Sequence, residues 1–171
     1  MDRLRNPSGV HGFSLTELII VLAIATTLMS VATIDYHQWQ VKHNVESQVK
    51  VMVSDFNELR VRALTTKQRQ SITLNKKNYI FKSYSSDDEP LAAGTVTLPA
   101  IHGVNYALKT DNSTFCNGQT FEIDHRGIMV GVTGSIYLDA NSSATLDCLR
   151  IQTVRINPGK KNDAWSMCND R

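Results

Sequence analysis

Three cysteines are the side chains of this chain best suited to covalent chemistry, and all lie in its second half. They are Cys116, Cys148 and Cys168. No C-x-x-C pair and no histidine at metal-ligand spacing accompanies them, so the pattern argues against zinc and for a disulfide. A final hairpin turning at Pro158 and Gly159 would place Cys148 opposite Cys168, and we predict that bond. Pairing of Cys116 with either of the other two stays open.

The histidines offer no catalytic pattern. His102 and His125 stand apart, without a nucleophile elbow, an HExxH helix or a phosphate-binding loop nearby. The run Asp124-His125-Arg126 is better interpreted as a loop at the end of a strand than as an acid–base pair. We therefore expect no enzyme activity and no cofactor.

One acidic loop, Ser85 to Glu89, ends at Pro90. Its carboxylates, Asp87, Asp88 and Glu89, are of the type that Ca²⁺ prefers, but they lack the spacing of a calcium-binding loop. We interpret the segment as a solvated loop and predict no metal site.

The carboxylate of Glu17 stands at the edge of a long apolar segment. From Leu18 to Ile34 no charged residue occurs, a run of about 17 and near the lower limit for a membrane-spanning helix. A carboxylate carried to the membrane centre costs about 2.5–3.5 kcal/mol, so such a group usually has a partner or a function. The alternative is that Glu17 reaches the headgroups or favours the helix N-terminus through its dipole.

A second helical segment continues the first without glycine or proline. Its apolar residues recur at spacings of four and three, which is typical of one helix face: Val45, Val49, Met52, Phe56, Leu59 and Ala63. We predict one helix from about Ser14 to Thr66, with residues 13–34 in the membrane and 35–66 amphipathic. Tyr36 and Trp39 would lie at the membrane interface. A coiled coil is the alternative to packing on a sheet.

From Ser71 onward the hydrophobic period changes to two, which indicates strands. Lys76-Lys77 separates the first two as a hairpin turn. The strand candidates are Ser71–Asn75, Asn78–Tyr84, Thr95–Leu98, Val104–Leu108, Thr120–Ile123, Ser135–Leu138, a β-rich run over Ala144–Asn157, and Ala164–Cys168. A long helix followed by many short antiparallel strands predicts an α+β fold, with residues 67–171 as one β-rich domain.

Residues 1–12 form a short basic leader. Arg3 and Arg5 favour a cytoplasmic N-terminus, which places the β-rich domain in an oxidising compartment where a disulfide persists. A secretory signal has its small-residue cleavage site after the apolar segment. Here the small residue, Gly12, comes before it, so cleavage would retain the anchor. The net charge of +2 implies no general polyanionic partner.

The segment from Gly12 to Glu17, together with the apolar run, resembles the class III signal of type IV pilins and type II secretion pseudopilins. This resemblance implies that a prepilin peptidase cuts the Gly12–Phe13 bond and methylates Phe13. It also implies that Glu17 guides packing among other pilins, from an inner-membrane position with a periplasmic domain. Many members have a proline where this chain has Ile34.

Two later segments, Phe121 to Leu138 and the ending LRIQTVRINPGKK, resemble the GspH/FimT branch of minor pilins and pseudopilins. The resemblance implies a minor subunit of a type IV pilus or of a secretion pseudopilus. Some members of that branch bind DNA during uptake, which makes a DNA receptor the alternative. The residues that would contact DNA are Arg150, Arg155, Lys160 and Lys161. The match is partial, because Gly159-Lys160-Lys161 stands where a Gly-Arg-x-Arg tail is common.

Overall fold

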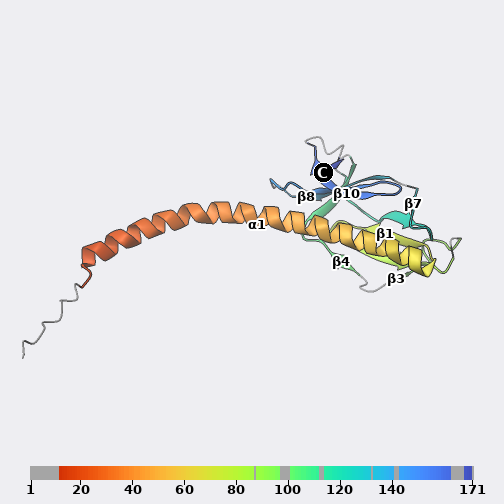
Figure 1. Ribbon diagram of the computed structural model, residues 1–171, viewed down its shortest axis with the longest axis horizontal. Helices are drawn as coiled ribbons and strands as arrows, with labels where there is room; N and C mark the ends of the chain where they lie inside the picture. Colours follow the sequence, from red (N-terminus) through yellow and green to blue (C-terminus); the bar gives the residue numbers. More distant parts are fainter. Residues whose placement is uncertain are drawn as a thin grey trace, which may run out of the picture. The chain divides into compact units, whose positions relative to one another are not determined.

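The computed structural model describes residues 12–86, 88–96, 101–111, 114–131, 133–140, 143–162 and 168–170, without the side chains of residues 31–34 and 170. The chain divides into two compact units, Met1–Trp39 and Gln40–Arg171. Helix α1 is 52 residues long, Leu15–Thr66, and contributes to both units (Figure 1). The predicted bounds of this helix differ from the observed ones by a single residue.

In the first unit, α1 exposes apolar side chains on every side. The five consecutive residues from Leu18 to Leu22 are each between 55 % and 59 % exposed. Successive helical residues point about 100° apart around the axis, so no face of this segment is covered by the chain. The helix is long and apolar enough to cross a membrane.

In the second unit, α1 buries one stripe. The six apolar residues predicted for this face are all buried, none more than 1 % exposed, which confirms the helical period. They share a hydrophobic core with strand residues such as Ile72, Phe121 and Leu149. The stripe therefore packs on the β-rich domain and not on a second helix as in a coiled coil.

Within the described residues, one sheet holds six strands: β1 (Gln70–Leu74), β2 (Asn78–Ser83), β3 (Thr95–Val96), β4 (His102–Gly103), β6 (Gln119–Ile123) and β7 (Met129–Val130). Their order is β3-β2-β1-β6-β7, and β4 pairs with β2. Every pairing is antiparallel. The predicted hairpin at Lys76-Lys77 is present, since the N–H of Asn75 donates to the carbonyl oxygen of Asn78 at 2.8 Å.

In the part of the chain that the structure describes, the second sheet holds five antiparallel strands: β5 (Ala107–Thr110), β8 (Gly134–Asp139), β9 (Cys148–Ile151), β10 (Ile156–Lys161) and β11 (Cys168–Asp170). Their order is β11-β10-β9-β8-β5. Buried residues of this sheet, including Leu108, Ile136 and Leu149, belong to the same core as the helix stripe. The α+β fold class predicted from the sequence is confirmed.

The predicted turn at Pro158 and Gly159 is wrong. Both residues lie inside β10, and the turn falls earlier, where the N–H of Gln152 donates to the carbonyl oxygen of Arg155 at 2.8 Å. The described pairs between β10 and β11 begin at Gly159. Pro158 therefore lies outside that ladder, in the kind of position where a strand tolerates a residue without an N–H.

Other strand predictions also differ from the structure, and the β-rich run predicted over Ala144–Asn157 is interrupted by the turn at residues 152–155. The segment Val104–Leu108 is not one strand, because the N–H groups of Val104 and Leu108 donate to the carbonyls of Lys77 and Lys76. Strands β4 and β7 were not predicted, since two residues are too few to show a period. Of the remaining candidates, residues 97, 98 and 164–167 lie outside the described residues.

Candidate functional site

Helix α1 begins directly after the predicted cleavage bond. The carbonyl oxygen of Ser14 accepts the N–H of Leu18 at 3.2 Å, which makes Ser14 the N-cap. The hydroxyls of Ser14 and Thr16 are 2.8 Å apart. Glu17 follows Ser14 at the Ser-x-x-Glu spacing of a capping box, a sequence signal that our predictions did not include.

The Gly12–Phe13 bond lies ahead of the helix and is accessible. Phe13 is 81 % exposed, and a β-carbon added at Gly12 would meet no atom within 4 Å. The fold of the chain therefore does not itself require glycine at this position. A preference for glycine here would come from a protein that recognises the segment.

Glu17 lies in the first turn of α1, an exposed carboxylate beside exposed apolar residues such as Leu18. The partial positive charge of a helix N-terminus favours a carboxylate in this turn. Chemically, the group can accept hydrogen bonds or pair with an amine. In an apolar environment it would gain more from such a partner than it does in water.

The polar side chains farther along the apolar segment find partners inside the helix. The hydroxyls of Thr26 and Thr27 donate to the carbonyls of Ala23 and Ile24 at 3.0 and 2.8 Å. Bonds to a carbonyl one turn earlier satisfy a hydroxyl where no water is present. These threonines are thus compatible with a helix in the bilayer.

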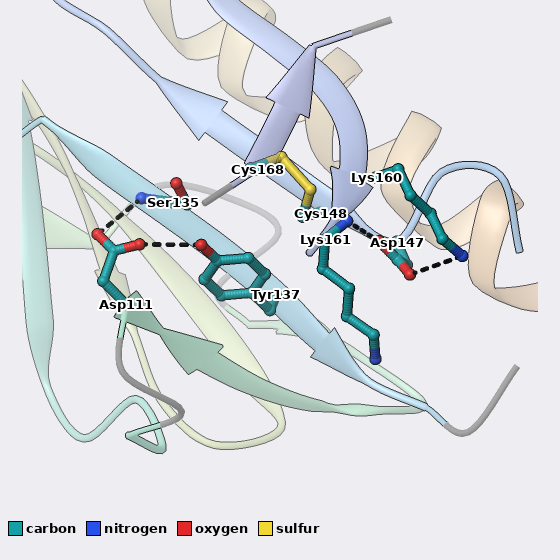
Figure 2. Close-up of a disulfide and its surroundings, with 8 residues drawn as sticks. All are labelled: Asp111, Ser135, Tyr137, Asp147, Cys148, Lys160, Lys161 and Cys168. Carbon is teal, nitrogen blue, oxygen red and sulfur yellow. Dashed lines mark hydrogen bonds and ion pairs between the residues drawn. A yellow bond between two sulfur atoms is a disulfide. The ribbon is translucent and has the colours of Figure 1, made fainter. Parts of the chain in front are cut away.

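The two C-terminal lysines hold the loop between β8 and β9 (Figure 2). The Lys160 Nζ lies 3.3 Å from Asp147 Oδ2 and also donates to the carbonyl of Ala144. The Lys161 N–H donates to Asp147 Oδ1 at 2.6 Å, and its Nζ donates to the carbonyl of Ala140 at 3.2 Å. Because Asp147 is buried, these contacts compensate a carboxylate removed from water.

The four predicted DNA contacts are dispersed by this arrangement. Lys160 and Lys161 are neighbours in β10, so their side chains leave opposite faces of the sheet. Arg150 is half-buried on β9, and Arg155 is exposed in the turn between β9 and β10. Burial lowers the pKa of Lys161, although Asp147 and Asp139 act in the opposite direction. These contacts count against a shared DNA surface, and DNA binding stays a prediction.

Cys148 and Cys168 form a disulfide, with their Cα atoms 6.0 Å apart. Cys148 on β9 lies opposite Gly159 of β10, and Cys168 on β11 lies opposite Lys161 of β10. The bond therefore joins the two strands that flank β10, and not two strands of one hairpin as we had assumed. Cys116 is free and buried, and burial raises the pKa of its thiol to about 11.

His102 packs within the domain. Its Nδ1 lies 3.1 Å from Asp55 Oδ2, which also accepts the hydroxyl of Tyr79. The rings of His102 and Tyr79 stack at a centroid distance of 4.9 Å. The histidine thereby ties β4 to β2 and α1, and this is a structural role.

The segment that contains His125 is a tight turn. Asp124 Oδ1 accepts the N–H groups of Arg126 and Ile128 at 2.9 and 2.8 Å, and Gly127 has a φ of 73°. An aspartate that bonds the backbone two residues on is typical of turns. The interpretation of this run as a loop after a strand is confirmed.

The acidic loop is closed by Glu89. Its Oε2 accepts the N–H and the hydroxyl of Ser85 at 2.7 and 2.8 Å, and these bonds lower the pKa of the Glu89 carboxyl. Asp87 lies outside the described residues. Within the described part of the chain no three metal-ligating side chains gather.

Comparison with known families gives one match. Residues 7–33 match the family model described as the prokaryotic N-terminal methylation motif. No curated protein and no solved structure matches the chain. The motif supports the class of type IV pilin-like proteins, structural subunits that a prepilin peptidase processes and that assemble with other pilin subunits. The apolar helix and the α+β domain fit that class.

Proposed function

We propose that this protein is a minor subunit of a type IV pilus or of a type II secretion pseudopilus. The observation that carries the proposal is the order of features at the N-terminus. An accessible Gly12–Phe13 bond is followed at once by a capped helix with Glu17 in its first turn, and then by a helix that is apolar on all sides. The minor role is supported by the resemblance of the later segments to the GspH/FimT branch.

In this account a prepilin peptidase cuts after Gly12, and the amine of Phe13 becomes the methylated N-terminus. The helix stays in the inner membrane until it is taken into a fibre. The basic leader favours a cytoplasmic N-terminus, so the β-rich domain lies in the periplasm. The buried disulfide suits an oxidising compartment.

Assembly follows from what α1 leaves uncovered. Its exposed apolar side chains can be covered by lipid or by the helices of neighbouring subunits. Among the helices of a fibre Glu17 would be a carboxylate in apolar surroundings, which makes pairing with a positive group favourable. The Phe13 amine of an adjacent subunit is such a group. The fibre is thus held by apolar packing, and the ion pair selects the register.

Substitution of Glu17 by alanine tests the assembly step. We expect Glu17→Ala to be cut at Gly12–Phe13 as the parent chain is, because the bond lies outside the helix. We expect it to be depleted from sheared filaments by about tenfold, since a lost ion pair in a low-dielectric site costs more than 1 kcal/mol. Immunoblots of the membrane and filament fractions measure both quantities.

Glu58→Ala is the matched control. Glu58 is an exposed helical glutamate whose only described ion pair is to Arg62 on the same helix. Its removal should leave filament content unchanged. Normal incorporation of Glu17→Ala would contradict the assigned role of the glutamate, while leaving peptidase processing intact.

A further inference from the structure

A cleft of about 350 Å³ opens where β5, β6 and β8 come together. Its polar lining residues are four with hydroxyls, one amide and one carboxylate: Thr110, Thr120, Thr133, Ser135, Gln119 and Asp111. Among the described residues that line it there is no lysine, arginine or histidine. The volume lies at the lower end of the range for small-molecule sites and suits one small ring.

The carboxylate of Asp111 is fixed in orientation (Figure 2). Its Oδ2 accepts the N–H of Ser135 at 3.3 Å, and its Oδ1 accepts the hydroxyl of Tyr137 at 3.0 Å. A carboxylate has about four acceptor positions, so each oxygen keeps capacity for a further donor. The group is therefore a prepared acceptor for two adjacent hydroxyls.

Two neighbours keep Asp111 in this position. Tyr137 is buried, and burial raises the pKa of its hydroxyl, so the hydroxyl remains a proton donor at neutral pH. A β-carbon at Gly134 would lie 3.2 Å from Asp111 Oδ2, so the glycine allows the carboxylate to lie close to β8. Next to Asp111 in the chain, Thr110 Oγ1 accepts a hydrogen bond from Gln119 Nε2 at 3.3 Å.

We propose that this cleft binds one pyranose ring of a neutral sugar, whose two adjacent hydroxyls donate to the two oxygens of Asp111. A neutral ligand suits the lining better than a cation does. The cleft is lined by hydroxyl and amide groups with a single negative charge, and Phe121 is too buried to offer its ring to a cation. The sugar is either a free monosaccharide or the terminal unit of a surface glycan, and both present the same chemistry.

The test uses the full chain in lipid nanodiscs, so that no sugar-containing detergent competes. Methyl glycosides of glucose, galactose, mannose and N-acetylglucosamine are titrated and followed by saturation-transfer NMR. We expect at least one to bind, with the strongest transfer to neighbouring ring protons and with no dependence on salt. Immobilised glycans ending in the same sugars form a second arm. Tighter binding there identifies a surface glycan, and equal binding identifies the free sugar.

Three variants locate the site. Asp111→Asn should weaken binding about tenfold, because it removes a charged acceptor. Thr133→Val, which keeps the size of the side chain, should weaken sugar binding by a smaller factor. If Asp111→Asn does not fold, this variant tests whether the sugar binds in the cleft. Asp88→Asn changes an exposed carboxylate outside the cleft and should bind as the parent chain does.

Three results would overturn the proposal. The first is that none of the sugars binds in either arm. The second is that folded Asp111→Asn and Thr133→Val both bind sugar as the parent chain does. The third is salt-sensitive binding of methylammonium in place of the sugars, because the site would then be one for a cation.

Discussion

At the scale of single residues, Gly159 is a position where the second sheet leaves no room for a side chain. It lies in β10 between β9 and β11, and a β-carbon there would come within 2.9 Å of Cys168 Sγ and closer still to the backbone oxygen of Asn169. Backbone atoms of a paired strand cannot move aside as a flexible side chain can. The glycine therefore allows β11 and its disulfide to approach β10.

We expect Gly159→Ala to lower the free energy of unfolding by about 1–3 kcal/mol, the usual cost of inserting a group into a filled space. Gly103→Ala is the control, because a β-carbon at Gly103 meets no atom within 4 Å. Chemical denaturation of both variants in detergent measures the difference. Equal stability of the two would contradict the packing described for β11.

Glu46 ties α1 to the loop between β8 and β9. Its Oε1 accepts the N–H and the hydroxyl of Thr145 at 2.8 and 2.7 Å, and these two bonds lower the pKa of the Glu46 carboxyl. A carboxyl whose pKa is lower in the folded chain adds stability above its unfolded pKa, about 4.3. This contribution is lost as the pH falls through the folded pKa.

We therefore expect Glu46→Gln to be less stable than the parent chain at pH 7, with the difference shrinking as the pH falls below about 4. The effect is small, because the side chain is partly exposed and solvent screens its charge. Thermal unfolding of both proteins across this pH range measures it. A difference that stays constant with pH would show that the charge of Glu46 is not what matters.

At the scale of elements, α1 packs one face against the core and leaves the neighbouring positions exposed. Met52 is completely buried, whereas its neighbour Val51 is 47 % exposed. Met52→Ala should cost about 2–5 kcal/mol of unfolding free energy, because it leaves a cavity beneath the sheet. Val51→Ala should change stability by no more than about 0.5 kcal/mol. Chemical denaturation compares them, and similar losses would contradict the assignment of the buried face.

The helix was predictable from the sequence, and the C-terminal strands were only partly so. The stripe from Val45 to Ala63 repeats over several turns, so its period is unambiguous. By contrast, Pro158-Gly159 is a strong local turn signal that tertiary packing overrides, since the space beside β11 admits only glycine. A local signal cannot report such a constraint. The pairing of Cys148 with Cys168 was expected, although the hairpin assumed for it is absent.

The candidate sites also differ in how far they can be predicted from the sequence. The Gly12–Glu17 signal is contiguous, so its chemistry can be recognised along the chain. The roles of Lys160 and Lys161 depend on contacts with Asp147 and with the carbonyls of a loop. The sequence does not reveal these contacts. The Asp111 cleft assembles residues from three strands and had no signal at all.

At the scale of the whole molecule, the two units differ in the surface that each exposes. The first unit exposes an apolar helix that must be covered by lipid or by other subunits, and the second unit is a stable domain with its own core. A protein of this kind is changed by a peptidase and then acts by assembly. The central claim is therefore that the chain is cut at Gly12–Phe13 and retains its anchor.

An intact-mass spectrum of the protein from membranes, with and without prepilin peptidase, tests this claim most directly. With the peptidase we predict a species that begins at methylated Phe13, and without it a chain that keeps residues 1–12. Gly12→Leu is the control. The space around residue 12 is open, so this variant should fold normally and yet resist cleavage. A full-length parent chain in the presence of active peptidase would contradict the account and leave an ordinary anchored domain.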